Sequence, residues 1–392
     1  MPQFSDHGVS YTASSDQSAP ALFHVITRYL QSAADVPNYL TELLETDPEM
    51  PMAWCLQGYL LKLAAHPRFG QQLAEIVSRL QQSASAANAR EQQHIAALTA
   101  WVNDDKQALD LLEGILDDHP QDMLALRIAH YMHFYTGSGP AMAASTGRAL
   151  ERWSADHPQF SYLLGMHAFG LEEAEDYAQA EKVGRSALAL NPDDLWSIHT
   201  VAHVLYMQDR HEEGKAWFTA NAQYLDGANN FRYHLHWHHA LHHFALQQYD
   251  AVLEIYDKEL DASTADDFYL DLCNNAALLW RLEHVGADVG QRWDKLEEIS
   301  ANHTSDKELL FASLHYLLPL LRTGNKKAND FMNSLQAWAS NPGDQASVAA
   351  KTGLKIAQAF QSGADSAMSD TELAPIGGSR AQRELFMMLP QH

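Results

Sequence analysis

The stretch 161–194 restricts the fold more than any other part of this chain. Counted from its first residue, large apolar residues, small residues and a proline stand at the offsets of a helix–turn–helix repeat of about 34 residues. These are Leu164, Ala168, Leu171, Ala180, Ala187 and Pro192. Only His167 and Gly184 replace the large apolar residues expected at their positions. The stretch therefore predicts one unit of a tetratricopeptide-like array.

The same pattern recurs on both sides of this unit and becomes weaker toward the ends. Copies start near Leu195 and near His234. Helical spacing dominates the chain, while the alternation typical of strands is scarce. We therefore predict an all-α fold, an αα-superhelix of tetratricopeptide-like repeats with divergent terminal repeats. Residues 21–392 are expected to form this single domain, after a flexible segment at 1–20.

Charge and hydropathy exclude several classes of function. The chain has 26 Lys and Arg against 50 Asp and Glu, so 26 − 50 gives a net charge of −24. This charge argues against binding to nucleic acid or to an anionic membrane surface. The start of the chain does not have the pattern of a signal peptide, and no apolar run is long enough to span a membrane. We expect a cytoplasmic protein, and a homo-oligomer is compatible with the sequence.

Histidine is the feature that an ordinary repeat protein would not have. Nine of the 22 histidines lie between residues 199 and 243. His199 and His203 are four residues apart, and so are His234 and His238. In the repeat register, His199, His203 and His238 fall at positions that face the concave groove, and His234 lies one turn earlier on the same side. Two neighbouring helices are therefore expected to direct imidazoles into one cavity.

An alternative register stays open for the second of these helices. His242 continues the same stripe of that helix, one turn beyond His238. A slip of one residue would instead place His236, His239 and His243 in the core.

Imidazoles at this spacing suit either of two kinds of chemistry. Together the four could bind a divalent metal such as zinc, iron or manganese, because pairs on one helix face make good ligands. Without a metal, the same side chains could perform acid–base catalysis, since histidine titrates near neutral pH. The predicted metal ligands are His199, His203, His234 and His238.

Further polar residues interrupt apolar helices and are candidates for the same site, because an unpartnered buried polar group costs about 1–3 kcal/mol. The predicted catalytic residues, as base, orienting group or further ligand, are His130, His167, Glu172, Asp271 and His315. The predicted pocket residues are Trp196, Trp237, Asn274 and Asn275.

Missing motifs narrow the reaction. His199 is not followed by Glu, so the HExxH pattern of many metalloproteases is absent. The GxSxG motif of serine hydrolases and the glycine-rich phosphate loops are also absent. Hydrolysis of a small molecule, or related acid–base chemistry, is the reaction that we predict.

Four runs of the sequence carry a family resemblance: GMHAFGLEEAEDYAQAEKVGRSALALNPDDLWSIHTVAHVLYMQDRHEEGKAWF, WHHALHHFALQQYDAVLEIYD, VGQRWDKL and LALRIAHYMHFYTG. They resemble the tetratricopeptide repeat protein 38 family in its bacterial members, over about residues 20–360. The resemblance implies a soluble, divergent repeat superhelix and does not imply an activity. Carried over by motif, its pattern includes His130, His167, His199, His203, His234, His238, Asp271 and His315. The family usually has His-Asn-Trp-Trp-His where this chain has Leu235 and His236, a difference that affects substrate identity more than the site.

Three functions remain open at this stage. The first is a small-molecule enzyme, a metal-dependent hydrolase whose site lies in the cavity of the superhelix. The second is a non-catalytic adaptor that binds a protein or peptide on its concave face, as repeat arrays commonly do. The third is a binder of metal or of a small ligand without catalysis.

Overall fold

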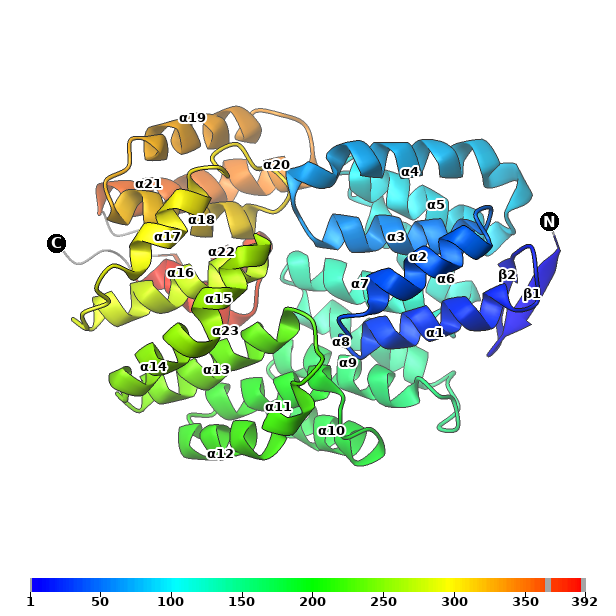
Figure 1. The fold of residues 1–392 in the computed structure, drawn as a ribbon, viewed down its shortest axis with the longest axis horizontal. Helices are drawn as coiled ribbons and strands as arrows, with labels where there is room; N and C mark the ends of the chain where they lie inside the picture. The colour runs from blue at the N-terminus through cyan, green and yellow to red at the C-terminus, as the bar shows by residue number, and fades with distance from the viewer. Residues whose placement is uncertain (1, 364–367, 389–392) are drawn as a thin grey trace.

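The computed structural model describes residues 2–363 and 368–388, and its regular structure is helical apart from one short hairpin and a single bridge (Figure 1). The hairpin consists of β1 (Gln3–Asp6) and β2 (Val9–Thr12). The longer helices are α1 (Ser18–Leu30), α2 (Val36–Thr46), α3 (Pro51–Leu63), α4 (Gly70–Ser83), α5 (Ala89–Val102), α6 (Gln107–Asp118), α7 (Met123–Tyr135), α8 (Gly139–Leu150), α9 (Phe160–Glu173), α10 (Tyr177–Leu190), α11 (Leu195–Met207), α12 (His211–Asn221), α13 (Phe231–Ala245), α14 (Tyr249–Ile255), α16 (Tyr269–His284), α17 (Arg292–Ser300), α18 (Leu310–Arg322), α19 (Lys327–Ala339) and α21 (Leu354–Ser362). The short ones are α15 (Asp261–Ser263), α20 (Asp344–Val348), α22 (Asp370–Leu373) and α23 (Arg380–Arg383). The all-α prediction is confirmed.

The N-terminal segment differs from the flexible segment expected at 1–20. Val9 and Tyr11 of β2 are buried, and the Thr12 amide donates to Glu91 of α5 over 2.7 Å. Helix α1 already begins at Ser18, before the expected boundary. The hairpin is held because its apolar face covers part of the core, which the Ser-, Asp- and Pro-rich composition of the segment does not indicate.

The predicted repeat unit 161–194 forms the antiparallel pair α9 and α10. Ala180 is fully buried between the two helices, as its position in the repeat predicts. The departure at Gly184 has a steric reason: a Cβ there would lie 3.2 Å from Val201 and 3.7 Å from Ala168. Gly184 therefore lets α10 approach both α9 and α11.

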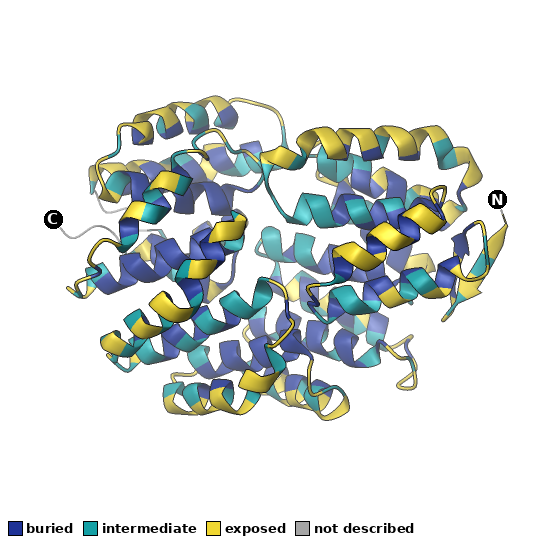
Figure 2. Cartoon of the chain, in the orientation of Figure 1, coloured by how far each residue is buried: buried dark blue, intermediate teal, exposed yellow. Residues whose placement is uncertain are grey.

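Most successive helices pack against one another, and they differ in how far they are buried (Figure 2). Helices such as α11, α16 and α18 are buried around almost their whole circumference. Helices such as α10, α12 and α17 bury only a narrow stripe and expose the opposite face. This division follows from sequence, since a helix that is apolar on all sides must be covered on all sides.

Early and late helices meet, so that the chain encloses a central space. Lys62 at the end of α3 forms an ion pair with Glu308 over 2.8 Å. His66 lies 3.0 Å from a carboxylate oxygen of Asp267, which precedes α16. After α21 the chain returns to the middle of the molecule (Figure 1), where Arg281 of α16 donates to the main-chain oxygen of Ala381 in α23 over 2.6 Å.

Within residues 2–363 and 368–388, none of the helices combines the length and the apolar character that a bilayer span requires.

A buried ionic network fixes the N-terminal helices to each other. Asp122 accepts hydrogen bonds from the Arg90 guanidinium, from Nε2 of His94 at 3.0 Å and from the Ala125 amide at 2.9 Å. The last contact caps the start of α7. Burial acts to raise the pKa of this carboxyl, but Arg90 and His94 outweigh it and hold the pKa well below the usual range.

We predict that Asp122→Ala lowers the free energy of unfolding by about 3–5 kcal/mol, because it leaves the Arg90 charge buried without a partner. A depressed carboxyl pKa contributes stability above its unfolded value of about 3.9 and loses it as the pH falls below that value. The difference between wild type and variant should therefore be full at neutral pH and shrink in acid. Urea unfolding at several pH values measures it. The exposed Asp118→Ala is the control, and an equal effect of both variants would contradict the prediction.

Candidate metal centre

Two neighbouring helices, α11 and α13, carry the four predicted metal ligands. Asp194 fixes the start of α11: its carboxylate accepts from the Trp196 amide at 3.1 Å and from the Ser197 hydroxyl at 2.5 Å. In this register His199 and His203 lie one turn apart on the side of α11 that faces α13. His234 and His238 are spaced in the same way on α13, and all four side chains are buried.

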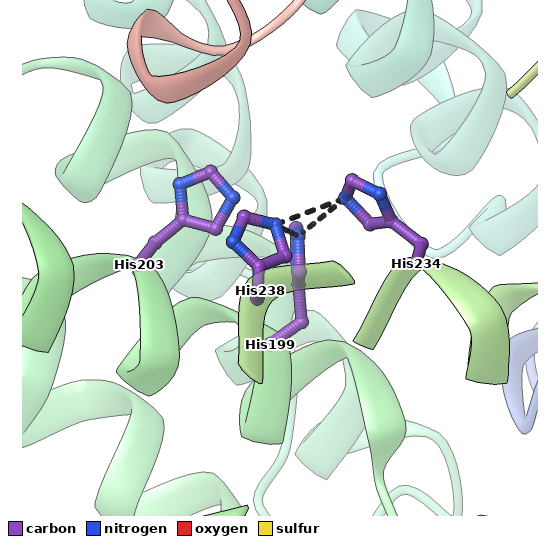
Figure 3. Close-up of side chains that lie close together, drawn as sticks. All are labelled: His199, His203, His234 and His238. Atoms are coloured by element: carbon purple, nitrogen blue, oxygen red, sulfur yellow. Dashed lines mark hydrogen bonds between the residues drawn. The ribbon is translucent and has the colours of Figure 1, made fainter. Parts of the chain in front are cut away.

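Three of these imidazoles meet at their Nε2 atoms (Figure 3). Nε2 of His199 lies 3.0 Å from Nε2 of His234 and 3.1 Å from Nε2 of His238. The remaining distance, between His234 and His238, is also 3.1 Å. Potential ligand atoms of all four histidines, His203 included, lie within 4.8 Å of one another. This buried group could hold a metal ion.

The three imidazoles are neutral, so lone pairs remain at the point where their Nε2 atoms meet. Burial, reinforced by the neighbouring histidines, lowers the pKa of His199 and His238 well below the usual range, and burial lowers that of His234 to about 3. All three are therefore neutral at pH 7. Nδ1 of His234 donates to Oδ1 of Asn274 at 3.2 Å, which leaves a lone pair on Nε2. Three ring nitrogens in a triangle cannot all satisfy one another with N–H donors, so a cation at this point removes a repulsion.

The distances suit a divalent ion. For an ion about 2.0–2.1 Å from each nitrogen, neighbouring ligands are about 2.9 Å apart in an octahedron and about 3.4 Å apart in a tetrahedron. The observed separations of 3.0 and 3.1 Å lie between these values. The Asn274 contact also has the form common at metal sites, where a second group fixes the ring orientation of a ligating histidine.

His203 stands beside this triangle and faces two carboxyl groups. Its Nδ1 lies 3.6 Å from Oε1 of Glu172, and neither of its ring nitrogens has a hydrogen-bond partner among the described residues. Glu172, Glu173 and His203 form a second group with closely spaced ligand atoms. Burial raises the pKa of both Glu172 and Glu173 to about 8 and lowers that of His203 to about 4. The group is positioned to hold and move protons next to the triangle.

A cavity of about 530 Å³ opens onto these histidines. His199, His203 and His234 form part of its wall. Helices α1, α3, α7, α9, α11, α13 and α16 contribute to the wall, and so does α23 through Gln382. Its aromatic wall residues near the histidines are Phe169, Trp196 and Phe231. A small molecule in this space would be surrounded by helices from both ends of the chain.

The predicted pocket residues have different positions. Trp196 lines the cavity, whereas Trp237 lies behind it, with its ring stacked on His234 at 5.5 Å between centroids. Asn274 contacts His234 directly. Asn275 does not reach the cavity wall, because its amide donates to the main-chain oxygens of Leu260 and Asp271.

The structure does not place three of the predicted catalytic histidines on the cavity wall. Nε2 of His130 donates to the Met166 carbonyl at 2.9 Å, and Nδ1 of His315 donates to the Phe311 carbonyl at 2.7 Å. Nδ1 of His167 hydrogen-bonds to the Thr146 hydroxyl at 3.0 Å, between α8 and α9. A catalytic residue must reach the reactants, so the role predicted for these three finds no support.

Asp271 and Glu172, the two predicted acidic residues, lie closer to the site. Asp271 is buried and accepts from Asn230, a cavity-wall residue, over 2.7 Å. Burial raises the pKa of Asp271 to about 8. Glu172 contacts His203, as described above. Of the two, only Glu172 faces a member of the histidine group.

The register question is also answered by the structure. His236, His239 and His243 are half-buried on the outer side of α13 and not in the core. His242 is buried but turned away from the triangle, against Gly214 and His211. A Cβ on Gly214 would lie 2.1 Å from the His242 ring, so only glycine leaves room for it.

Sequence reasoning missed several residues of the cavity wall, among them Arg127, Tyr131 and Asn230. Arg127 carries a signal that could have been used, because it is a charged residue within the otherwise apolar helix RIAHYMHFY. Glu173, which joins the His203 group, ends the same helix as Glu172, but sequence reasoning selected only Glu172, because charges at helix ends are usually solvated.

A scan of the chain against protein-family models finds no match.

We predict that the protein, purified without chelators, contains close to one divalent metal ion per chain, as measured by plasma mass spectrometry. His199→Ala should remove most of it, because two of the three close nitrogen contacts are lost. His236→Ala, on α13 but outside the triangle, is the matched control and should keep the metal. A metal-free wild type that also fails to take up zinc, iron or manganese would contradict the assignment.

Asn274→Leu tests the tautomer argument. Loss of the acceptor for Nδ1 of His234 should lower metal affinity by about 10–100-fold, the usual effect of removing such a contact. Asn274→Asp keeps an acceptor oxygen and should retain tight binding. Competition with a fluorescent chelator measures both affinities, and an unchanged affinity in Asn274→Leu would show that the contact has no part in orienting the ligand.

Proposed function

We propose that this protein is a metal-dependent hydrolase of small molecules. The observation that carries the proposal is the meeting of three neutral, buried imidazole nitrogens at 3.0–3.1 Å, two of whose rings, those of His199 and His234, lie on the wall of a cavity of about 530 Å³. Burying such a group without a function costs stability, since its polar atoms lose water and gain no adequate partner.

The composition of the cavity wall favours a small substrate over an extended peptide. Peptide-binding repeat arrays use an open concave surface. Here α23 and helices from both halves of the chain contribute to the wall of one space. This arrangement supports an enzyme over the adaptor that the sequence left open.

The chain's own residues account for the proton movements of a hydrolysis. A divalent ion held by His199, His234 and His238 would acidify a bound water and polarise a carbonyl. His203 accepts a proton from the attacking water, and Glu172, whose raised pKa lets it hold a proton, lies 3.6 Å from Nδ1 of His203. The hydroxyl adds to the acyl carbon, the bond from that carbon to the leaving oxygen breaks, and His203 returns the proton to the leaving oxygen. Phe169, Trp196 and Phe231 limit the access of bulk water.

The proposal also covers the type of helical repeat, the family and the cellular location of the protein. Consecutive antiparallel helix pairs, with residues 161–194 as one pair, support a tetratricopeptide-like superhelix. The quoted motifs support membership of the tetratricopeptide repeat protein 38 family. We also propose that the protein is cytoplasmic and that its substrates are acyl compounds.

Turnover of 4-nitrophenyl acetate provides the test. We expect hydrolysis that stops on chelation and returns with zinc, iron or manganese. His203→Ala should lower kcat by about 10²–10⁴-fold, the usual contribution of a general base, and should keep the metal. His243→Ala, which lies on the outer side of α13 and hydrogen-bonds to Gln248, is the control.

Three results would revise the proposal. Metal loss in His203→Ala equal to that in His199→Ala would make His203 the fourth ligand. An unchanged rate would remove it from the chemistry. A metal-loaded protein without chelator-sensitive hydrolysis of acyl esters would be a non-catalytic metal binder.

A further inference from the structure

Arg127 is a buried cation on the cavity wall that no carboxylate neutralises. Its side chain is almost wholly buried on α7. No ion pair joins Arg127 to an acidic group of the described residues, although the chain has 50 Asp and Glu against 26 Lys and Arg. Asp194 senses its charge, but the oxygens of Asp194 accept from the start of α11 instead.

Aromatic groups hold the guanidinium in place without using up its donors. Its Cζ lies 4.0 Å from the ring centroid of Trp196 and 4.5 Å from that of Tyr131. One terminal nitrogen donates to the Tyr131 hydroxyl over 2.9 Å, while Nε has no partner. A flat cation packed against two rings loses conformational freedom before any ligand arrives, and it keeps N–H groups for one.

An oxyanion is the ligand that fits such a group. The guanidinium presents paired N–H donors that match the two oxygens of a carboxylate, and this pairing is strong where water is excluded. A dianionic phosphate would need more positive charge than this wall offers. Lys62, near the end of a neighbouring wall helix, is already paired with Glu308, and Arg68, which also lines the cavity, is exposed to solvent. A single carboxylate is the better match.

The position of Arg127 relative to the histidines sets the shape of the ligand. Trp196 contacts both: its ring centroid is 4.0 Å from Cζ of Arg127 and 5.4 Å from the centroid of His199. Apolar wall residues such as Phe134 and Leu60 border the same cavity. A ligand with one end at Arg127 therefore reaches the triangle across roughly the width of an aromatic ring.

We propose that the substrate is a monocarboxylate whose carboxyl group binds Arg127, with the bond to be cleaved about one aromatic ring away, beside His199, His234 and His238. The placement of the cleaved bond rests on the proposed hydrolase function, whereas the carboxylate site does not. The acidic surface of the protein does not prevent this, because charges beyond about 8 Å are screened at physiological ionic strength.

Binding tests the carboxylate site without any turnover. Benzoate, titrated calorimetrically into wild-type protein, should bind at least tenfold more tightly than benzamide. Arg127→Met should remove that preference and weaken benzoate binding by about 10–100-fold. The exposed Arg152→Met removes the same charge elsewhere and should change nothing.

A metal-free variant separates this site from the metal centre. The double variant His199→Ala/His238→Ala should still prefer benzoate over benzamide. If it loses benzoate while Arg127→Met retains it, the carboxylate binds the metal and the inference is wrong. Arg127→Lys and a thermal melt of each variant guard against loss of fold: if Arg127→Met melts with wild type and still prefers benzoate, the inference is also wrong.

Turnover then tests the distance between the carboxylate site at Arg127 and the bond that is cleaved. 4-Acetoxybenzoate and 4-acetoxybenzamide have the same acetyl ester across the ring from a carboxylate or a neutral amide. We expect kcat/KM to favour the carboxylate by at least tenfold in wild type and not in Arg127→Met. If the benzoate preference holds but neither ester is hydrolysed, the proposed function fails and the carboxylate site stands. Equal hydrolysis of both esters by wild type would overturn the proposed spacing.

Discussion

The structure of the site depends on three imidazole nitrogens that meet in a dry place with no proton arrangement that satisfies them all. Helices α11 and α13 must stay at one separation for His199, His234 and His238 to remain 3.0–3.1 Å apart. Trp237 stacks on His234 from behind, and Asn274 of α16 fixes its tautomer. Helices α11, α13 and α16 are therefore coupled through one small polar group, which could hold a metal ion.

Burial from water determines the protonation and the interactions of this polar group. Lys62 and Glu308, more than two hundred positions apart in the sequence, join the two ends of the helical path. The C-terminal segment returns to the centre, where Glu384 accepts from the Tyr206 hydroxyl at 3.0 Å and Ser379 and Gln382 reach the cavity. Removing water raises the pKa of Glu172 and lowers that of His203, and it strengthens every charge interaction inside.

The distribution of charge follows the same logic. Most of the acidic residues lie at the surface, where water solvates them. A few ionic groups are buried in the interior, and they differ in their partners. Asp122 has all its partners inside the protein and holds helices together. Arg127 has aromatic supports and no counter-ion, which leaves it free for a ligand. A buried charge whose partners are all inside the protein stabilises the fold, whereas a buried charge without a counter-ion is available to a ligand.

How much could be predicted depended on the range of the interaction concerned. Local periodicity gave the helices, and the i, i+4 spacing identified the four histidines of α11 and α13, because both properties are set within one or two turns. The ordered hairpin at residues 3–12 was missed because its stability comes from distant contacts, such as that of Thr12 with Glu91. Glu173 was missed because burial of a helix end depends on what covers it.

From its sequence alone, this protein is a chain of helices with a histidine stripe on two adjacent ones. Tertiary structure alone decided which histidines serve a site: His130 and His315 resemble His199 in sequence context, but main-chain carbonyls take up their N–H groups. It also decided that Asn274 contacts His234 and that Arg127 has no carboxylate partner among the described residues. Hydrogen-bond partners are chosen by neighbours in space, and local sequence does not contain that information.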